Sequence, residues 1–196
     1  NISGRAPTQI ARLGVARSFQ TPQLAADQTV LDTVAVARSN REGVSLPKTL
    51  LALASTIGPD PSLIRARVNA MALLEQAGLA DQALQPCGAL AHGDRRRVEL
   101  MRALATDPKL LILDEPAAGL AESEVERLSR LLRACAERGM GVMVIEHLMG
   151  FVLPLADRVI CLDEGQVIAE GRPDKVALHE GVRAAYLGMT LESIGP

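Results

Sequence analysis

The sequence predicts a parallel α/β fold, and three features of its second half support this prediction. First, residues 110–113 are four consecutive aliphatic residues without helical periodicity, which is typical of a strand buried on both faces. Second, Asp114 and Glu115 follow directly, where the carboxyl end of a parallel strand places ligand-binding residues. Third, strand-like runs alternate with helical patterns from Pro61 onward. We therefore expect a parallel sheet with an antiparallel edge.

The composition narrows the class of protein. A length of 196 residues suits one α/β domain, and a net charge of −2 offers no basic surface for nucleic acid. Phe19, Phe151 and Tyr186 are the only aromatic residues, so base stacking by aromatic side chains is not expected. The three cysteines are widely spaced and predict buried thiols rather than a metal site.

The first sixty residues predict short elements and one irregular segment. Four elements are expected before residue 40: a helix over 8–13, a strand over 15–20, a loop over 21–28 and a helix over 30–37. Thr29 is placed to cap the second of these helices. Gly and Pro recur between residues 40 and 61, which predicts an irregular or partly helical insertion.

The rest of the chain gives clearer signals. The expected elements are helices over 61–77, 94–107, 123–138, 148–156 and 174–178, and strands over 110–113, 142–145, 158–162 and 166–169. In the first of these helices, the apolar residues at helical spacing are Ile64, Val68, Met71 and Leu74. Ser123 and Glu126 predict a capping box, and residues 163–165 predict a tight hairpin turn.

The strand ends carry the candidate chemistry. Successive strand residues point in opposite directions, so Asp114 is assigned to a metal shell and Glu115 to an attacking water, the two roles that phosphoryl transfer requires. His147 ends the neighbouring strand and is placed to donate a hydrogen bond to a terminal phosphate. Gln20 also ends a strand, and its amide could coordinate Mg²⁺ or water. An acidic turn after an ordinary core strand is the structural alternative for the acid pair.

A second candidate is the start of the helix after residue 90. Ala91, His92, Gly93 and Asp94 lead into that helix, whose first backbone N–H groups could hold a phosphate. Val98, Met101 and Ala105 are expected on its inner face, whereas the three arginines at 95–97 are expected to form a solvated face. A Gly-x-x-x-x-Gly-Lys-Ser/Thr loop is absent from the 196 residues.

The order of these motifs resembles that of the ATP-binding subunits of ABC transporters. The corresponding motifs are the Q-loop (Gln20), the signature motif (90–94), Walker B (110–115), the D-loop (117–120) and the H-loop (His147). Residues 10–20, 114–120 and 144–149 are similar to those of branched-chain amino-acid importer ATPases. Lipopolysaccharide-export ATPases are similar at the same places.

The resemblance implies an ABC-type P-loop NTPase that binds ATP and Mg²⁺, with a helical subdomain over about residues 30–100 and a catalytic core from residues 1–29 and 101–196. Glu115 and His147 would be catalytic. Asp114 and Gln20 would hold Mg²⁺ through water, and the signature residues would face the ATP of a second ATPase subunit, identical or different. Permease subunits would dock near residues 20–27. The resemblance also implies a location on the cytoplasmic face of the cell membrane, without a nucleic-acid partner.

Two residues differ from the family's usual motifs, and one motif of the family is not found in the chain; all three differences affect the expected activity. Ala91 lacks the hydroxyl that the family's signature motif commonly offers, and Ala121 replaces a common Asp or Asn of the D-loop. The family's first strands and Walker A loop would lie upstream of Asn1, so the resemblance implies an N-terminally truncated piece that binds ATP weakly by itself. A non-catalytic docking or dimerisation module is the alternative. DNA-repair and translation-associated ABC ATPases are disfavoured, because neither a coiled-coil insertion nor a basic stripe is found.

Overall fold

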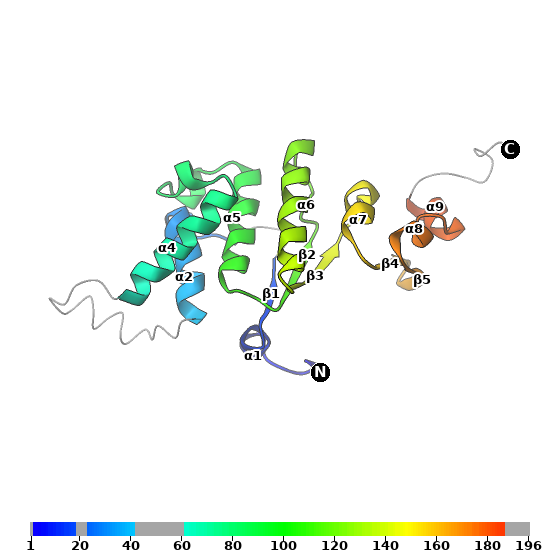
Figure 1. Cartoon of the computed structure of the whole chain (residues 1–196), viewed down its shortest axis with the longest axis horizontal. Coiled ribbons are helices and arrows are strands. Elements are labelled where there is room, and N and C mark those ends of the chain that lie inside the picture. The colour runs from blue at the N-terminus through cyan, green and yellow to red at the C-terminus, as the bar shows by residue number, and fades with distance from the viewer. Residues whose placement is uncertain (1, 19–22, 42–60, 187–196) are drawn as a thin grey trace. The chain divides into compact units, whose positions relative to one another are not determined.

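The structure is a computed structural model that describes residues 2–18, 23–41 and 61–186 (Figure 1). The chain forms two compact units, which are considered separately. Unit 1 comprises Asn1–Pro116 and Cys135–Met143, and unit 2 comprises Ala117–Ala134 and Val144–Pro196. The predicted insertion over 40–61 and the predicted strand end at Gln20 lie mostly or wholly outside the described residues. The helical subdomain expected over about 30–100 stays a prediction.

The helices follow the predicted order, with one addition. They are α1 (Pro7–Arg12), α2 (Val30–Arg41), α4 (Pro61–Gln76), α5 (His92–Ala105), α6 (Glu122–Glu137), α7 (Met149–Leu155), α8 (Pro173–Val176) and α9 (Glu180–Tyr186), with short 3-10 turns η1 (Ala80–Gln82) and η2 (Cys87–Ala89). Helix α9 was not predicted, because its few apolar residues do not form a clear helical stripe. Among the described residues, no helix has the length and apolar character needed to cross a membrane.

The strands form two sheets in the described part of the chain. They are β1 (Val15–Arg17), β2 (Leu110–Asp114), β3 (Gly141–Ile145), β4 (Val159–Asp163) and β5 (Gln166–Gly171). One sheet has the order β1-β2-β3, and β1 pairs with β2 in parallel. The second sheet is the antiparallel pair β4-β5. The predicted mixed α/β class with a parallel sheet is therefore confirmed, and the antiparallel strands make a sheet of their own.

Three helices build much of the core of unit 1. Helices α2, α4 and α5 contact one another and lie side by side in Figure 1. Their fully or nearly buried apolar residues are Val30, Val34, Ala35, Ala66, Ala70, Leu74, Val98, Leu100, Met101, Leu104 and Ala105. The prediction that Val98, Met101 and Ala105 face inward is therefore confirmed.

The predicted period of α4 is right, but its phase is partly wrong. The buried residues are Ala66, Ala70 and Leu74, whereas Ile64 is 49% exposed and Val68 is 62% exposed. The two buried alanines have small side chains, which allow the neighbouring helices to approach closely. A pattern that weighs only large apolar residues therefore selects a face rotated away from the core.

Hydrogen bonds cap the N-terminus of α2 and the C-terminus of α4. Thr29 Oγ1 accepts a hydrogen bond from the backbone N–H of Asp32 at 3.1 Å and donates to its carboxylate at 2.7 Å. This arrangement confirms the predicted cap. Helix α4 ends in a Schellman turn, in which Gly78 has φ +67° and the N–H of Leu79 donates to the carbonyl of Leu74 at 2.8 Å.

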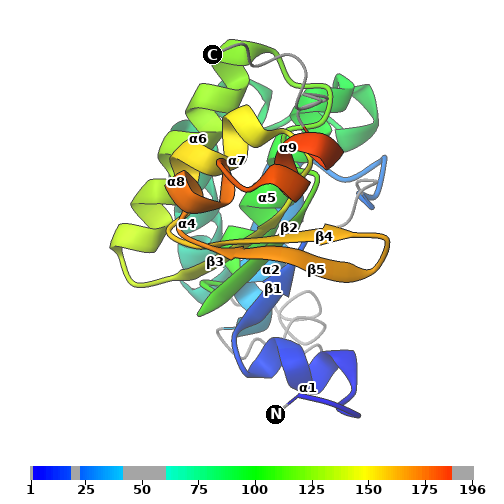
Figure 2. The ribbon, with the colours of Figure 1, turned by 90° about the vertical axis from the view of Figure 1, so that its right-hand side faces the viewer.

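Unit 2 contains the β4-β5 hairpin, which α8 and α9 contact (Figure 2). Glu164 and Gly165 both have positive φ values, 45° and 78°, as a tight two-residue hairpin turn requires. A small core is formed by Val159 and Cys161 of β4 together with Val176 of α8 and Val182 of α9. The predicted hairpin is confirmed.

The sheet of β1, β2 and β3 is less buried than predicted. Leu111 and Leu113 of β2 are fully or nearly buried, but the alternate residues of that strand are only half-buried. In β3, Met143 is 51% exposed and Ile145 is 43% exposed. Burial of the strand at 110–113 on both faces was therefore a wrong prediction, because consecutive aliphatic residues alone do not show what covers each face.

Candidate nucleotide site

The predicted acid pair lies where β2 ends. Asp114 is the last residue of β2, and its side chain is 18% exposed. Arg17, on the neighbouring strand β1, donates from Nη2 to Asp114 Oδ2 at 3.2 Å. The backbone N–H of Asp114 lies 3.5 Å from Ser18 Oγ. Parallel pairing of β1 with β2 therefore places a cation and a hydroxyl at the same strand end as the predicted metal-binding acid.

Glu115 follows Asp114 in a constrained backbone conformation. Its φ is +46°, in the left-handed region that residues other than glycine seldom adopt. Such a conformation costs about 1–3 kcal/mol and is common at functional sites. The strand ends at Asp114, directly before this residue.

The signature residues lie at the N-terminus of α5. Ala91 is the N-cap, and His92, Gly93 and Asp94 form the first turn. The first backbone N–H groups of a helix have no partner within that helix and favour an anion in front of them. Ala91 and His92 are exposed, so this end of α5 is accessible to a ligand in the described structure.

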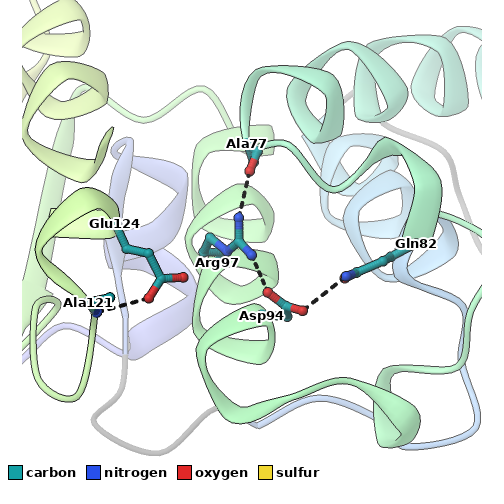
Figure 3. Close-up of polar contacts among 6 residues, drawn as sticks. All are labelled: Ala77, Gln82, Asp94, Arg97, Ala121 and Glu124. Atoms are coloured by element: carbon teal, nitrogen blue, oxygen red, sulfur yellow. Dashed lines mark hydrogen bonds and ion pairs between the residues drawn. The ribbon is translucent and has the colours of Figure 1, made fainter. Parts of the chain in front are cut away.

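Asp94 is held within the fold by two side chains (Figure 3). Gln82 Nε2 donates to Asp94 Oδ2 at 3.0 Å, and Arg97 Nη2 donates to Asp94 Oδ1 in a short ion pair. Arg97 Nη1 also donates to the carbonyl of Ala77 at 3.1 Å. These bonds connect the first turn of α5 to η1 and to the residue after α4.

The three consecutive arginines of α5 do not form a solvated face, contrary to the prediction. All are only partly exposed. Arg95 donates to the carbonyls of Leu90 at 3.1 Å and Gly88 at 2.6 Å, and Arg97 bonds as described above. A guanidinium group carries five donors, so it satisfies backbone carbonyls that a neighbouring loop would otherwise leave unpaired. No pattern in the sequence indicates these acceptors.

The segment before the signature motif packs against the segment after the predicted Q-loop. The N–H of Gly88 donates to the carbonyl of Ala26 at 2.8 Å, and the N–H of Cys87 donates to that of Gln28 at 2.8 Å. A Cβ added at Gly88 would lie 2.9 Å from the Ala26 carbonyl oxygen. Glycine is therefore required for this close backbone approach.

Unit 2 carries the H-loop residue. His147 follows β3, and its side chain is 62% exposed. Its neighbour Glu146 has a fully buried side chain, and Glu146 Oε2 lies 3.7 Å from His147 Nδ1. The backbone N–H of His147 donates to the same oxygen at 3.0 Å. The exposed imidazole thus lies next to a buried carboxylate that the prediction missed, for which the only sequence signal was an acid at a strand end.

The D-loop continues into α6 with a cap different from the predicted one. Helix α6 begins at Glu122, and Glu124 Oε2 accepts a hydrogen bond from the N–H of Ala121 at 3.0 Å (Figure 3). The predicted capping box of Ser123 and Glu126 is therefore wrong. A glutamate at the third helical position can reach back to the N-cap backbone whatever the N-cap side chain is, so alanine is tolerated there.

The chain is similar to proteins of known family. The ABC transporter family model matches residues 2–118. The chain belongs to the ABC transporter family. It is also 34% identical over 193 residues to the high-affinity branched-chain amino acid transport ATP-binding protein LivG of Escherichia coli K12, which covers 96% of this chain and 73% of LivG. The corresponding protein BraF of Pseudomonas aeruginosa is 33% identical over 192 residues, covering 95% of this chain and 72% of BraF.

Solved structures confirm the fold of an ABC ATPase. The ADP conformation of MJ1267, an ATP-binding cassette of an ABC transporter, matches with a TM-score of 0.74 and 29% identity, covering 96% of this chain and 74% of that chain. A post-hydrolysis dimer of the cassette MJ0796, bound to ADP and Pi, matches with a TM-score of 0.67 and 26% identity. That match covers 85% of this chain and 66% of that chain. The predicted family and enzyme class, an ABC-type ATPase, are therefore confirmed.

Proposed function

We propose that this chain belongs to an ATP-binding and ATP-hydrolysing subunit that energises an ABC importer of branched-chain amino acids. The observation that carries the proposal is the 34% identity to LivG over 96% of the chain, together with the similar match to BraF. Both relatives are named as ATP-binding proteins of branched-chain amino acid transport. The lipopolysaccharide-export alternative has no comparable support among these relatives.

In this proposal the strand ends divide the work of hydrolysis. Glu115 accepts a proton from the attacking water or orients it, and His147 donates a hydrogen bond to the terminal phosphate. The exposed imidazole of His147 and the constrained backbone of Glu115 support these roles. Gln20, proposed to bind Mg²⁺ through water, lies outside the described residues.

The chemistry of Asp114 fits a magnesium-bound nucleotide. Mg²⁺ takes oxygen ligands and is often held by one or two carboxylates together with phosphates and water. Asp114 supplies a partly exposed carboxylate at a strand end, and Arg17 already pairs with one of its oxygens. When bound, Mg²⁺ would neutralise part of the phosphate charge, and Asp114 would hold it directly or through water.

The signature motif serves a second ATPase subunit in this proposal. His92 and Gly93 present backbone N–H groups toward the ATP of the partner, and Asp94 holds the helix start in place through Gln82 and Arg97. Ala91 contributes no hydroxyl, so we expect slower turnover than a serine would give. We further propose that permease subunits contact the region of residues 20–27 on the cytoplasmic face of the membrane.

The test uses the purified ATPase subunit. We expect MgATP hydrolysis, and we expect Glu115→Gln to retain ATP while its turnover falls at least about a hundredfold, as loss of a general base commonly causes. Reconstituted with its permease, the wild type should drive uptake of leucine but not of an unrelated sugar. Unchanged turnover in Glu115→Gln would remove that residue from the mechanism, and absence of MgATP binding would favour the docking-module alternative.

A further inference from the structure

Glu146 lies at the end of β3 with none of its side chain exposed. A fully buried carboxylate is costly unless hydrogen bonds replace its lost hydration. The mechanism proposed above gives this residue no role, although it is adjacent to His147. Its partners therefore indicate what it does.

Among the described residues, three backbone N–H groups of unit 2 donate hydrogen bonds to this carboxylate. Oε1 accepts from Ala117 at 3.0 Å, and Oε2 accepts from His147 at 3.0 Å and from Leu148 at 3.4 Å. Ala117 is 29 residues away in the sequence. One side chain thus binds the start of the D-loop with one oxygen and the backbone of the H-loop with the other.

Both tethered segments continue into fixed structure. The N–H of Leu120 donates to the carbonyl of Ala117 at 3.2 Å, which forms the turn that precedes α6. Leu148 is the N-cap of α7. A shift of the D-loop at Ala117 must therefore either break a hydrogen bond to Glu146 or move the backbone that carries His147.

We propose that Glu146 is a positioning residue that couples the D-loop to His147, which rests on the proposed role of His147 in hydrolysis. The carboxylate fixes the His147 backbone, so the imidazole reaches the phosphate from a defined position. It also transmits a displacement of the D-loop, the segment leading to Ala121, to the same imidazole. Because the donors are backbone groups, they remain when a neighbouring side chain is replaced by any residue other than proline, and the coupling therefore depends on the Glu146 side chain.

Glu146→Gln tests this coupling with little change in volume. The amide keeps one oxygen, so its NH₂ group must face either Ala117 or the His147–Leu148 pair, and one tether is lost. We expect kcat for MgATP hydrolysis to fall about tenfold to a hundredfold, the range that a misplaced catalytic group can cause, while the KM for ATP stays within about twofold. Glu170→Gln, which removes an exposed carboxylate of the same unit, should change neither quantity.

A double-mutant cycle separates positioning from mere stabilisation. If Glu146 acts through His147, adding Glu146→Gln to a His147→Ala protein should lower kcat by less than about twofold. A full multiplicative loss in that background would overturn the proposal, since the effect would then not pass through the imidazole.

Amide hydrogen exchange tests the tether without relying on ATP hydrolysis. In Glu146→Gln, exchange should accelerate at least about tenfold at Ala117 or at the His147–Leu148 pair, and not in the β4-β5 hairpin. Unchanged exchange at all three amides would overturn the tether. If the wild type hydrolyses no ATP but the exchange result holds, the proposed function fails, and with it the catalytic part of the coupling, whereas the tether stands.

Discussion

Two carboxylates, Asp94 in unit 1 and Glu146 in unit 2, hold motif backbones in contrasting ways. Asp94 is 16% exposed and is bound by the side chains of Gln82 and Arg97. The side chain of Glu146 is fully buried and accepts hydrogen bonds from three backbone N–H groups of the described residues. Each fixes a segment that our proposal places next to a nucleotide, but the partners of Asp94 are side chains and those of Glu146 are backbone groups.

The difference shows how stability depends on the type of partner. When a charged side-chain partner is removed, the carboxylate keeps its own charge but loses the counter-charge that stabilised it. When the donors are backbone groups, replacing a side chain other than by proline leaves them in place. The Asp94 network can thus be changed at three side chains, whereas the Glu146 network is changed most directly at Glu146.

Removal of Arg97 should produce the largest effect on stability. Arg97→Met leaves the Asp94 carboxylate with Gln82 and the Ala77 carbonyl without its donor, so we expect the free energy of unfolding to fall by about 2–3 kcal/mol. Chemical denaturation measures this change. The control is Arg130→Met, which removes an ion pair to Glu126 whose side chains are 69% and 66% exposed. That control should change stability by less than about 0.5 kcal/mol, and equal losses in both variants would refute the importance of the Asp94 network.

Gly88→Ala tests a backbone contact in unit 1, for comparison with the backbone bonds of Glu146. The added Cβ would meet the Ala26 carbonyl oxygen at 2.9 Å, so we expect a loss of about 1–2 kcal/mol from overpacking, measured by thermal unfolding. Gly150→Ala is the matched control. A Cβ there meets nothing within 4 Å inside α7, and helix propensity should raise stability by about 0.5–1 kcal/mol. A tolerated Gly88→Ala would show that the two segments can move apart at little cost.

Glu124 provides a more exposed carboxylate that binds a single backbone N–H. Glu124→Ala removes the acceptor for Ala121, and we expect a loss of about 0.5–1 kcal/mol by denaturant unfolding. Glu126→Ala should cost less, because that residue makes only an exposed ion pair. The opposite order would restore the capping box that the sequence predicted.

Asp174 gives the smallest expected effect, because its carboxylate lies at the surface. Donation from Arg172, at 3.1 Å, holds the pKa of Asp174 below its ordinary value. Arg172→Ala should raise this pKa, as NMR titration would show. A lowered pKa favours the folded chain above the ordinary carboxyl pKa, and this advantage disappears as the pH falls through the lowered value. An unchanged pKa in the variant would show that Arg172 is not the cause.

Local signals in the sequence predicted local structure well. Thr29 capped its helix and residues 163–165 formed their turn, because a few neighbouring residues determine both features. The position of Asp114 at a strand end also followed from a short aliphatic run. These features depend on backbone preferences within a few residues.

Features that depend on residues distant in the sequence were not predicted. The burial of Glu146 depends on Ala117, 29 residues away, and the arginines of α5 bond carbonyls of a loop whose path no pattern revealed. The buried face of α4 was misassigned because alanines, not the larger Ile64 and Val68, pack against its neighbours. Tertiary contacts decided each of these cases.

Hydrogen exchange of the Glu115→Gln protein, with and without MgATP, tests the central claim most directly. The claim is that the signature turn, the acid pair and the H-loop face bound nucleotide. We predict that MgATP slows amide exchange in residues 91–94, 114–116 and 146–148, and leaves exchange in the β4-β5 hairpin unchanged. Bound ATP without protection of these segments would contradict the claim.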